Sequence, residues 1–309
     1  MKLPFRPARA LLFILFLLTT STTIVAADGI VSETTTHPFP GIRILERVTD
    51  SPPQRIYAAF IEIDSASHFI DATKPTGKLR TVEEWAEETN ALVAINGDFY
   101  RWNNGVVHLY GDAVGGGERW PNAQTGRNDQ LTGEWFFNKY GWMAFGGKGA
   151  TFTHSQWVKR NHEVTSGWEP DEEAPEIPPN TRALVSGFPQ LVIDGKEISC
   201  DDPTDSSCFP DRSDMRARHP RTAIGLTRNH DTLILVVVDG RSKTSVGMYG
   251  TELAALMKEL GAWNAINLDG GASSQMYVKG RGTINAPEST ARRKVLNHLG
   301  ALPKGGSSQ

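Results

Sequence analysis

Two helix-to-strand segments with nearly identical endings constrain the fold of this chain more than any other feature. The first, TVEEWAEETNALVAINGDF, begins at a capping threonine, Thr81, and the second, TELAALMKELGAWNAINLDGG, begins at residue 251. Each joins a helical spacing of apolar residues to a short strand, and each places an aspartate just beyond it, Asp98 and Asp269. The pattern predicts a possible internal duplication whose two strand ends converge on one site.

The rest of the chain is rich in strands. Runs of branched and aromatic residues occur at 42–48, 56–63, 91–95, 184–193, 222–227, 232–238 and 264–268. Only 81–89 and about 251–260 have helical apolar spacing. We therefore expect an α+β fold in which strand-rich mixed sheets carry a few packed helices.

The first 27 residues have the composition of an export signal. Positive charges at Lys2, Arg6 and Arg9 precede an apolar run over 10–18, and a threonine-rich stretch ends at Ala27. That run is about half of the roughly 20 residues that span a bilayer, so stable membrane insertion is not expected. We predict a signal peptide over 1–27, cleavage after Ala27, a single domain over 28–309, and a secreted or periplasmic location.

The charge balance argues against nucleic acid as a partner. Lysine and arginine total 32 and aspartate and glutamate total 35, which gives a formal net charge of −3. A chain without a basic excess lacks the electrostatic attraction that polyanion binders use.

The two cysteines, Cys200 and Cys208, lie in one polar loop, CDDPTDSSC. In an exported protein this arrangement favours a disulfide over two free thiols. The spacing matches no zinc pattern, so no metal ligand is assigned.

Aspartates follow two of the expected strands. TLILVVV ends in Asp239-Gly240-Arg241, and NAINL ends in Asp269-Gly270-Gly271. An aspartate before glycine commonly forms only a turn. However, side chains beyond the carboxyl ends of strands often build ligand sites, and the pairing of the two aspartates across one strand-helix-strand unit favours that reading.

Six motifs make the chain resemble the phosphodiester glycosidase family. They are AINGDF (94–99), SGFPQLVIDG (186–195), HPRTAIGL (219–226), VVVDGR (236–241), SVGMYGTELAALMKELGAWNAINLDGGASS (245–274) and RKVLN (293–297). Two positions depart from the family pattern. Ala272 stands where a third glycine is usual, and Lys294 stands where proline is common.

The resemblance implies hydrolysis of a sugar-1-phosphodiester, of the N-acetylglucosamine-1-phosphate type, at the anomeric carbon. It implies a carboxylate that attacks that carbon or activates water, and arginines that bind the phosphate. The expected catalytic residues are Asp269, with Asp239 and Asp98 as partners. The expected substrate and phosphate ligands are Asn96, Arg221, Arg241, Gly270, Gly271, Ser273, Ser274 and Arg293. His219 adjoins a motif and is interpreted as structural.

No cofactor is required by this chemistry, although a calcium or magnesium ion is possible among the aspartates. Two other functions stay open. One is a noncatalytic exported protein that binds glycans or assists exopolysaccharide or envelope assembly, and the other is a metal-dependent phosphodiesterase that cuts the P–O bond. The second lacks the expected histidine and aspartate cluster.

Overall fold

The computed structural model describes residues 21–22, 29–76, 78–103, 106–121, 135–147, 149–153, 156–159, 177–209, 212–286 and 292–305. The proposed export signal over 1–27 lies outside these residues except for Ser21 and Thr22, and its cleavage stays a prediction. None of the helices in the described ranges has the length and apolar character needed to cross a membrane.

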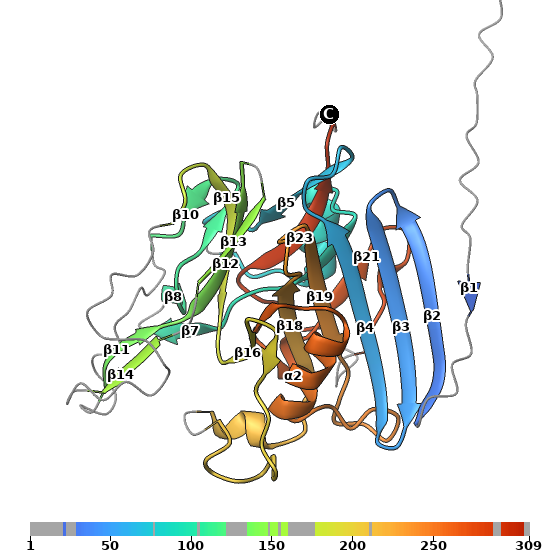
Figure 1. Ribbon diagram of the computed structural model, residues 1–309. Coiled ribbons are helices and arrows are strands. Elements are labelled where there is room, and N and C mark those ends of the chain that lie inside the picture. The colour runs from blue at the N-terminus through green and yellow to red at the C-terminus, as the bar shows by residue number, and fades with distance from the viewer. Residues whose placement is uncertain are drawn as a thin grey trace, which may run out of the picture.

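A large sheet forms the centre of the described part of the chain (Figure 1). Its strand order is β1 (Ser21–Thr22), β2 (Ile30–Phe39), β3 (Ile42–Asp50), β4 (Pro53–Glu62), β19 (Thr232–Val238), β18 (Arg221–Leu226), β20 (Asn264–Asn267), β16 (Gln190–Ile193) and β17 (Lys196–Glu197).

Two further sheets pack beside the large one. One has the order β22 (Gly282–Thr283), β21 (Met276–Val278), β6 (Val93–Asn96), β23 (His298–Pro303) and β5 (His68–Ala72). The other has the order β10 (Glu118–Arg119), β9 (Val114–Gly115), β15 (Thr181–Gly187), β12 (Gly141–Gly146) and β13 (Ala150–Thr153). Two-stranded pairs join β7 (Tyr100–Asn103) to β8 (Val106–Leu109) and β11 (Trp135–Lys139) to β14 (Gln156–Lys159).

The expected fold class needs correction. Neighbouring strands pair antiparallel throughout the described sheets, so these sheets are not mixed. Within the described ranges there are two α-helices, α1 (Val82–Thr89) and α2 (Gly250–Glu259), with short 3-10 turns η1 (Ser213–Arg216) and η2 (Gly271–Ser273). With so few helices, the fold is mainly β rather than α+β. The expectation of mixed sheets failed for a separate reason: apolar spacing identifies strands but does not state their direction.

Helix α1 begins at the predicted threonine cap, whereas α2 begins at Gly250 with Tyr249 as its N-cap, not Thr251. The Thr81 hydroxyl accepts a hydrogen bond from Glu84 N at 3.1 Å, and the Glu84 carboxylate accepts one from Thr81 N at 2.8 Å. This reciprocal cap fixes the start of α1. At α2, the Glu252 carboxylate accepts a hydrogen bond from Tyr249 N at 3.1 Å.

The central strands of the large sheet, β18, β19 and β20, are buried on both faces. Along β19, Leu233, Leu235 and Val237 pack in the core shared with the other two sheets, whereas the alternate residues pack beneath α2. Side chains in a strand alternate between faces, so a continuous apolar run such as TLILVVV marks a strand covered on both sides. The site therefore rests on a rigid central layer.

The ends of β19, β20 and β6 lie near one another, as predicted. β18 pairs antiparallel with both β19 and β20, so these two run parallel and end at the same edge. Asn96, the last residue of β6, donates from Nδ2 to the Asp269 carbonyl at 2.6 Å, and Asp269 N donates to the Gly97 carbonyl at 3.2 Å. The convergence is confirmed, while an ancestral duplication stays a prediction.

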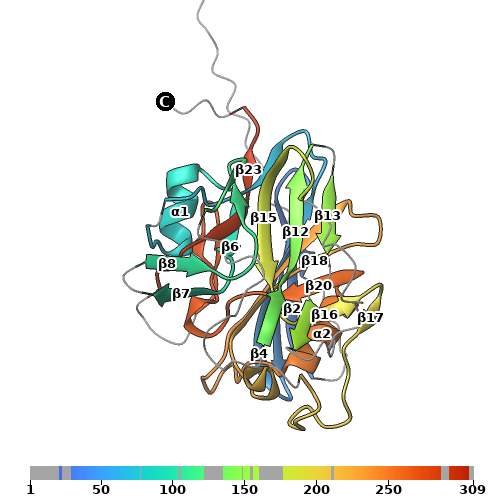
Figure 2. The ribbon, with the colours of Figure 1, turned by 90° about the vertical axis from the view of Figure 1, so that its left-hand side faces the viewer.

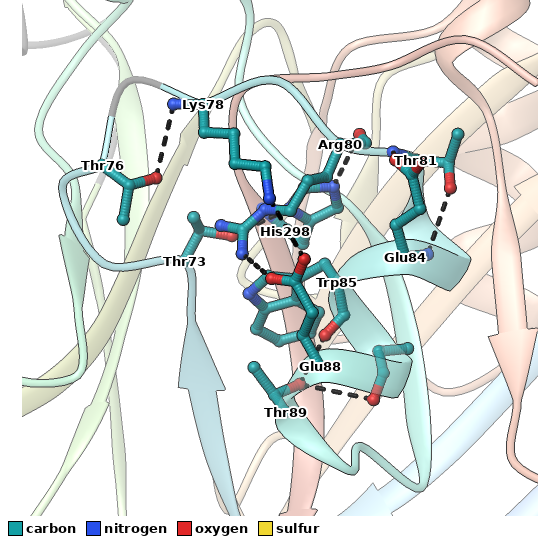
Figure 3. Close-up of polar contacts among 11 residues, drawn as sticks. Thr73, Thr76, Lys78, Arg80, Thr81, Glu84, Trp85, Glu88, Thr89 and His298 are labelled. Carbon is teal, nitrogen blue, oxygen red and sulfur yellow. Dashed lines mark hydrogen bonds and ion pairs between the residues drawn. The ribbon is translucent and has the colours of Figure 1, made fainter.

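Helix α1 packs beside β6 and β23 (Figure 2) and is held there by a buried histidine (Figure 3). The His298 ring stacks on Trp85, with 5.3 Å between ring centroids. Its Nε2 lies 3.1 Å from the Arg80 carbonyl, which can only accept, so Nε2 carries the hydrogen and Nδ1 accepts from the Thr73 hydroxyl at 2.8 Å. Burial lowers the pKa of His298 to about 3, which keeps the ring neutral.

The expected disulfide is present between Cys200 and Cys208. Cys208 is buried and packs in the apolar cluster under α2. The bond therefore anchors the polar loop to the core just before the segment that carries η1.

Candidate active site

A pocket of about 250 Å³ opens beyond the ends of β18 and β20. Its lining residues come from the segment over η1 and the start of β18, from the end of β20, from the loops after β6, β19 and β20, and from the segment before β23. They are Phe99, Arg212, Asp214, His219, Arg221, Arg241, Asn267, Leu268, Asp269, Gly270, Gly271, Ala272 and Arg293. Four guanidinium groups and two carboxylates thus face one small volume, which suits an anionic ligand.

Asp269 is the predicted catalytic carboxylate that the structure does place in this pocket. It is partly buried, and burial raises its pKa to about 6 against the opposing effects of the Ser273 hydroxyl and the Arg293 charge. A carboxyl group with this pKa is mostly ionised at neutral pH. Because its pKa lies close to neutral pH, it can also take up and release a proton there. Asp269 can therefore act as a nucleophile or as a general base.

Asp98 was expected as a partner of Asp269, but it is not among the residues that line the pocket. It is 1% exposed, and its two carboxylate oxygens accept hydrogen bonds from Ser186 N and Asn297 Nδ2, both at 2.7 Å. Burial raises its pKa well above the usual value. These contacts tie β15 to the segment before β23, so the structure assigns Asp98 a structural position.

Asp239, the other expected partner, also lies outside the pocket lining. Its carboxylate accepts hydrogen bonds from Asn285 Nδ2 at 2.9 Å and Ala286 N at 3.1 Å, and its carbonyl accepts one from the Ser245 hydroxyl at 2.7 Å. Burial raises its pKa. Asp239 thus fixes the turn that presents Arg241 rather than facing the ligand volume.

The three predicted phosphate ligands all reach the pocket, but they differ in what their donors contact. Arg221 is 2% exposed and donates to the carbonyls of Met248, Asp214 and Ala217 at 2.8–2.9 Å. Its guanidinium therefore holds η1 in place, which corrects its expected role as a free clamp. Arg241 and Arg293 are exposed at the pocket wall, and the charge of Arg293 acts on Asp269.

The sequence interpretation missed Arg212 and Asp214. Arg212 binds the Asp214 carboxylate in a fork, with Nε–Oδ1 at 2.7 Å and Nη2–Oδ2 at 2.9 Å, and its guanidinium lies 4.6 Å from the centre of the Phe99 ring. Burial would raise the pKa of Asp214, but the hydrogen bond and charge of Arg212 outweigh it and lower the pKa. Asp214 is therefore a second ionised carboxylate in the pocket.

His219 was interpreted as structural, yet it lines the pocket beside Arg241. Arg241 Nε and Nη2 lie 3.2 and 3.1 Å from His219 Nδ1. A guanidinium only donates, so Nδ1 accepts and carries no hydrogen. Arg241 also has a left-handed backbone with φ of +58°, an uncommon conformation for a non-glycine residue that is often found at functional sites.

The remaining predicted residues support or border the pocket. Asn96 is fully buried, and its Oδ1 accepts hydrogen bonds from the Thr222 hydroxyl at 2.8 Å and Gln275 N at 3.2 Å, so it positions the Asp269 backbone instead of contacting a ligand. Gly270 and Gly271 lie in the pocket wall, whereas Ser273 and Ser274 are fully buried behind it and are absent from the lining.

Metal ligation finds no support in the described residues, where no three histidine, cysteine, aspartate or glutamate side chains gather closely enough to hold an ion. The divalent ion considered from the sequence stays untested. Of the three carboxylates that the sequence grouped together, Asp98 and Asp239 are engaged by asparagines and backbone amides.

This fold and site define a class: a mainly β protein that presents two partly buried carboxylates, Asp269 and Asp214, in an arginine-lined pocket. A family model described as phosphodiester glycosidase matches residues 89–302. The chain belongs to this family of hydrolases.

Known relatives agree with this assignment. Bovine N-acetylglucosamine-1-phosphodiester alpha-N-acetylglucosaminidase is 27% identical over 207 residues, which cover 65% of this chain and 33% of that protein. The SPbeta prophage-derived uncharacterized protein YomE of Bacillus subtilis is 40% identical over 83 residues, which cover 27% of this chain and 13% of that protein. The chain thus spans a third or less of these relatives.

A solved structure shares the fold. The catalytic domain of zebrafish N-acetylglucosamine-1-phosphodiester alpha-N-acetylglucosaminidase, auto-inhibited by its pro-peptide, superposes with a TM-score of 0.56 at 18% identity. The match covers 92% of this chain and 87% of that domain.

Proposed function

We propose that this protein is a secreted or periplasmic glycosidase that hydrolyses a sugar-1-phosphodiester at the anomeric carbon, of the N-acetylglucosamine-1-phosphate type and carried on a glycan. The observation that carries the proposal is the position of Asp269. It is the carboxylate whose pKa is raised to about 6, and it lies in a pocket walled by arginines. Family membership supports the reaction class.

The pocket suits a reaction with an anionic leaving group. A phosphate monoester departs readily, so the reaction needs charge stabilisation more than a strong general acid. Arg241 and Arg293 line the pocket, and we assign them to the phosphate oxygens. Arg212 lines it too, with its guanidinium bound to Asp214. Positive charge fixed before the reaction lowers the energy of the phosphate that leaves.

Asp269 supplies the remaining chemistry. Its carboxylate attacks the anomeric carbon or removes a proton from an attacking water, and the bond between the anomeric carbon and the phosphate oxygen breaks. The electron pair leaves with the phosphate, which departs as an intact phosphate monoester. Where Asp269 attacks, water then hydrolyses the glycosyl ester and frees both the sugar and the carboxylate; where Asp269 activates water, that water supplies the anomeric hydroxyl of the free sugar. Asp214 is the second carboxylate in the pocket and takes the place that the sequence assigned to Asp239 and Asp98.

The experiment that tests this proposal is hydrolysis of a synthetic N-acetylglucosamine-1-phosphodiester, with products identified by mass and with and without a chelator. The wild type should release free sugar and intact phosphate monoester without added metal, and Asp269→Asn should not. Asp231→Asn is the matched control, because Asp231 is exposed and its pKa is lowered by hydrogen bonds from Thr227 and Thr232.

Each of the other outcomes contradicts the proposal in a different way. Release of sugar-1-phosphate that stops with chelator would indicate a metal-dependent phosphodiesterase. Binding of the substrate with no turnover over a broad panel of phosphodiesters would indicate a noncatalytic glycan-binding or envelope-assembly protein.

A further inference from the structure

Asn267 is a polar residue of the pocket to which the chemistry above gives no role, although it lies within the motif over 245–274. It is the last residue of β20, two positions before Asp269, and it is 2% exposed. It nevertheless lines the pocket. A nearly buried amide among the pocket residues requires an account of both of its polar atoms.

One hydrogen bond fixes the orientation of this amide. The Phe188 carbonyl lies 3.1 Å from Asn267 Nδ2 and 2.8 Å from Arg212 Nη1. A carbonyl can only accept, so the amide nitrogen must face Phe188 and the amide oxygen must face away from it. The same carbonyl thus sets the direction of one amide and one guanidinium in the pocket wall.

The amide oxygen is left as an acceptor. Asn267 Oδ1 is buried and has no hydrogen-bond partner among the residues that the structure describes. A buried acceptor without a partner is unfavourable, and sites often keep such an atom because a ligand satisfies it. The ligand must then bring a hydrogen-bond donor to this point.

The phosphate cannot be that donor. An ionised phosphodiester presents only acceptor oxygens, which suit the arginines and repel Oδ1. A sugar presents hydroxyl groups and, if it is an amino sugar, an amide N–H.

We propose that Asn267 is a specificity-determining residue whose Oδ1 accepts a hydrogen bond from a hydroxyl or acetamido N–H of the sugar attached to the phosphate. This inference rests on the proposed function and deepens it. The arginines recognise the phosphate, and Asn267 selects phosphodiesters that carry a glycosyl group over simple alkyl or aryl phosphodiesters.

Binding measured by calorimetry tests the inference separately from turnover. The probes are N-acetylglucosamine 1-phosphate, its analogues in which one hydroxyl or the acetamido group is replaced by hydrogen, and inorganic phosphate. Loss of the relevant donor should weaken binding to the wild type by about tenfold, as expected for one hydrogen bond in a desolvated site. The same loss should change binding to Asn267→Ala less than twofold.

Two further variants separate recognition from folding. Asn267→Asp loses the amide donor to Phe188, as Asn267→Ala does, but keeps an acceptor oxygen, so it should still discriminate between the analogues. Asn264→Ala is the matched control on the same strand, because Asn264 is 4% exposed, accepts from Asp194 N at 3.0 Å and is not among the pocket residues. It should discriminate as the wild type does.

The outcomes distinguish this inference from the proposed function. Hydrolysis by the wild type with equal discrimination in the wild type, Asn267→Ala and Asn267→Asp would overturn the inference alone. Discrimination that depends on the residue 267 oxygen, without hydrolysis of any diester, would support the inference and overturn the proposed function. Equal loss of inorganic phosphate binding in Asn267→Ala and Asn267→Asp would show a structural role and would also overturn the inference.

Discussion

Replacement of Asp269 by asparagine should stabilise the protein while removing its activity. The fold raises the pKa of this carboxyl from 3.8 to about 6, mainly by burial. A shift of about two pKa units corresponds to about 3 kcal/mol of preference for the neutral form. Asparagine is neutral and of the same size, so Asp269→Asn should gain about 2–3 kcal/mol of unfolding free energy at pH 8, the lower figure allowing for the altered contact with Ser273.

The gain should depend on pH in a defined direction. Well below pH 3.8, Asp269 is protonated in both the folded and the unfolded wild type. Its ionisation then contributes no difference in unfolding free energy between the wild type and Asp269→Asn. Between pH 3.8 and about 6 the unfolded chain releases the proton while the folded protein retains it, and the wild type loses stability relative to the variant. Above pH 6 the difference should stay constant.

Denaturant unfolding at a series of pH values measures this difference. Asp231→Asn is the control with the opposite sign, because hydrogen bonds lower the pKa of Asp231 and its loss should reduce stability at neutral pH. A variant Asp269→Asn that is no more stable than the wild type at pH 8, or whose gain does not change with pH, would refute the argument that burial of a charge at this position costs folding free energy.

Three other predictions concern activity and stability. In pH profiles of hydrolysis, kcat/KM should fall about tenfold per pH unit below pH 6, because Asp269 must be ionised, and a flat profile down to pH 4 would exclude this role. Steady-state kinetics of Arg241→Ala should show KM raised at least about tenfold, whereas Arg228→Ala, which removes an arginine stacked on Trp263 outside the pocket, should leave it unchanged. Replacing Cys200 and Cys208 together by serine should reduce the unfolding free energy by about 2 kcal/mol, and an unchanged denaturation midpoint would show that the closed loop contributes nothing.

Local sequence patterns identified the two helices, most of the core strands and several of the pocket residues. The cap of α1, the apolar spacing of α1 and α2, and the apolar run of β19 report directly on a helix start and on covered faces. Asp269, Arg241 and Arg293 could be predicted because they follow strands or motifs whose ends meet in the fold. Strand direction was not predictable, since a continuous apolar run such as TLILVVV reports that both faces are covered, and β19 is antiparallel to both of its neighbours.

The errors involve partners that are distant along the chain. Asp98 resembles Asp269 in sequence, but Asn297, which is 199 positions away, engages one of its oxygens. Asp239 is engaged by Asn285 in the same manner. No local pattern shows whether an aspartate after a strand meets an asparagine or a pocket, because that depends on which loop the tertiary structure places opposite it.

Arg212 and Asp214 were missed for another reason. They lie at the start of η1, in a segment without a motif. Contacts with residues of other segments bring it to the pocket: Arg212 with the Phe188 carbonyl, and Arg221 with the Asp214 carbonyl. The weak signal for His219 was its place at the start of HPRTAIGL, where a structural role was equally consistent with the sequence.

The position of β23 also determines when this protein can finish folding. β23 lies between β5 and β6, although more than 200 residues separate it from either strand along the chain. During synthesis, the edges of β5 and β6 that β23 will pair with stay unpaired until residues 298–303 have been made. Pairings between strands so far apart in the sequence also form slowly. Asn297 directly precedes β23, so its hydrogen bond to Asp98 forms at the same late stage. Chains that are not yet complete expose two strand edges, and a chaperone or rapid export would protect them from association with other chains.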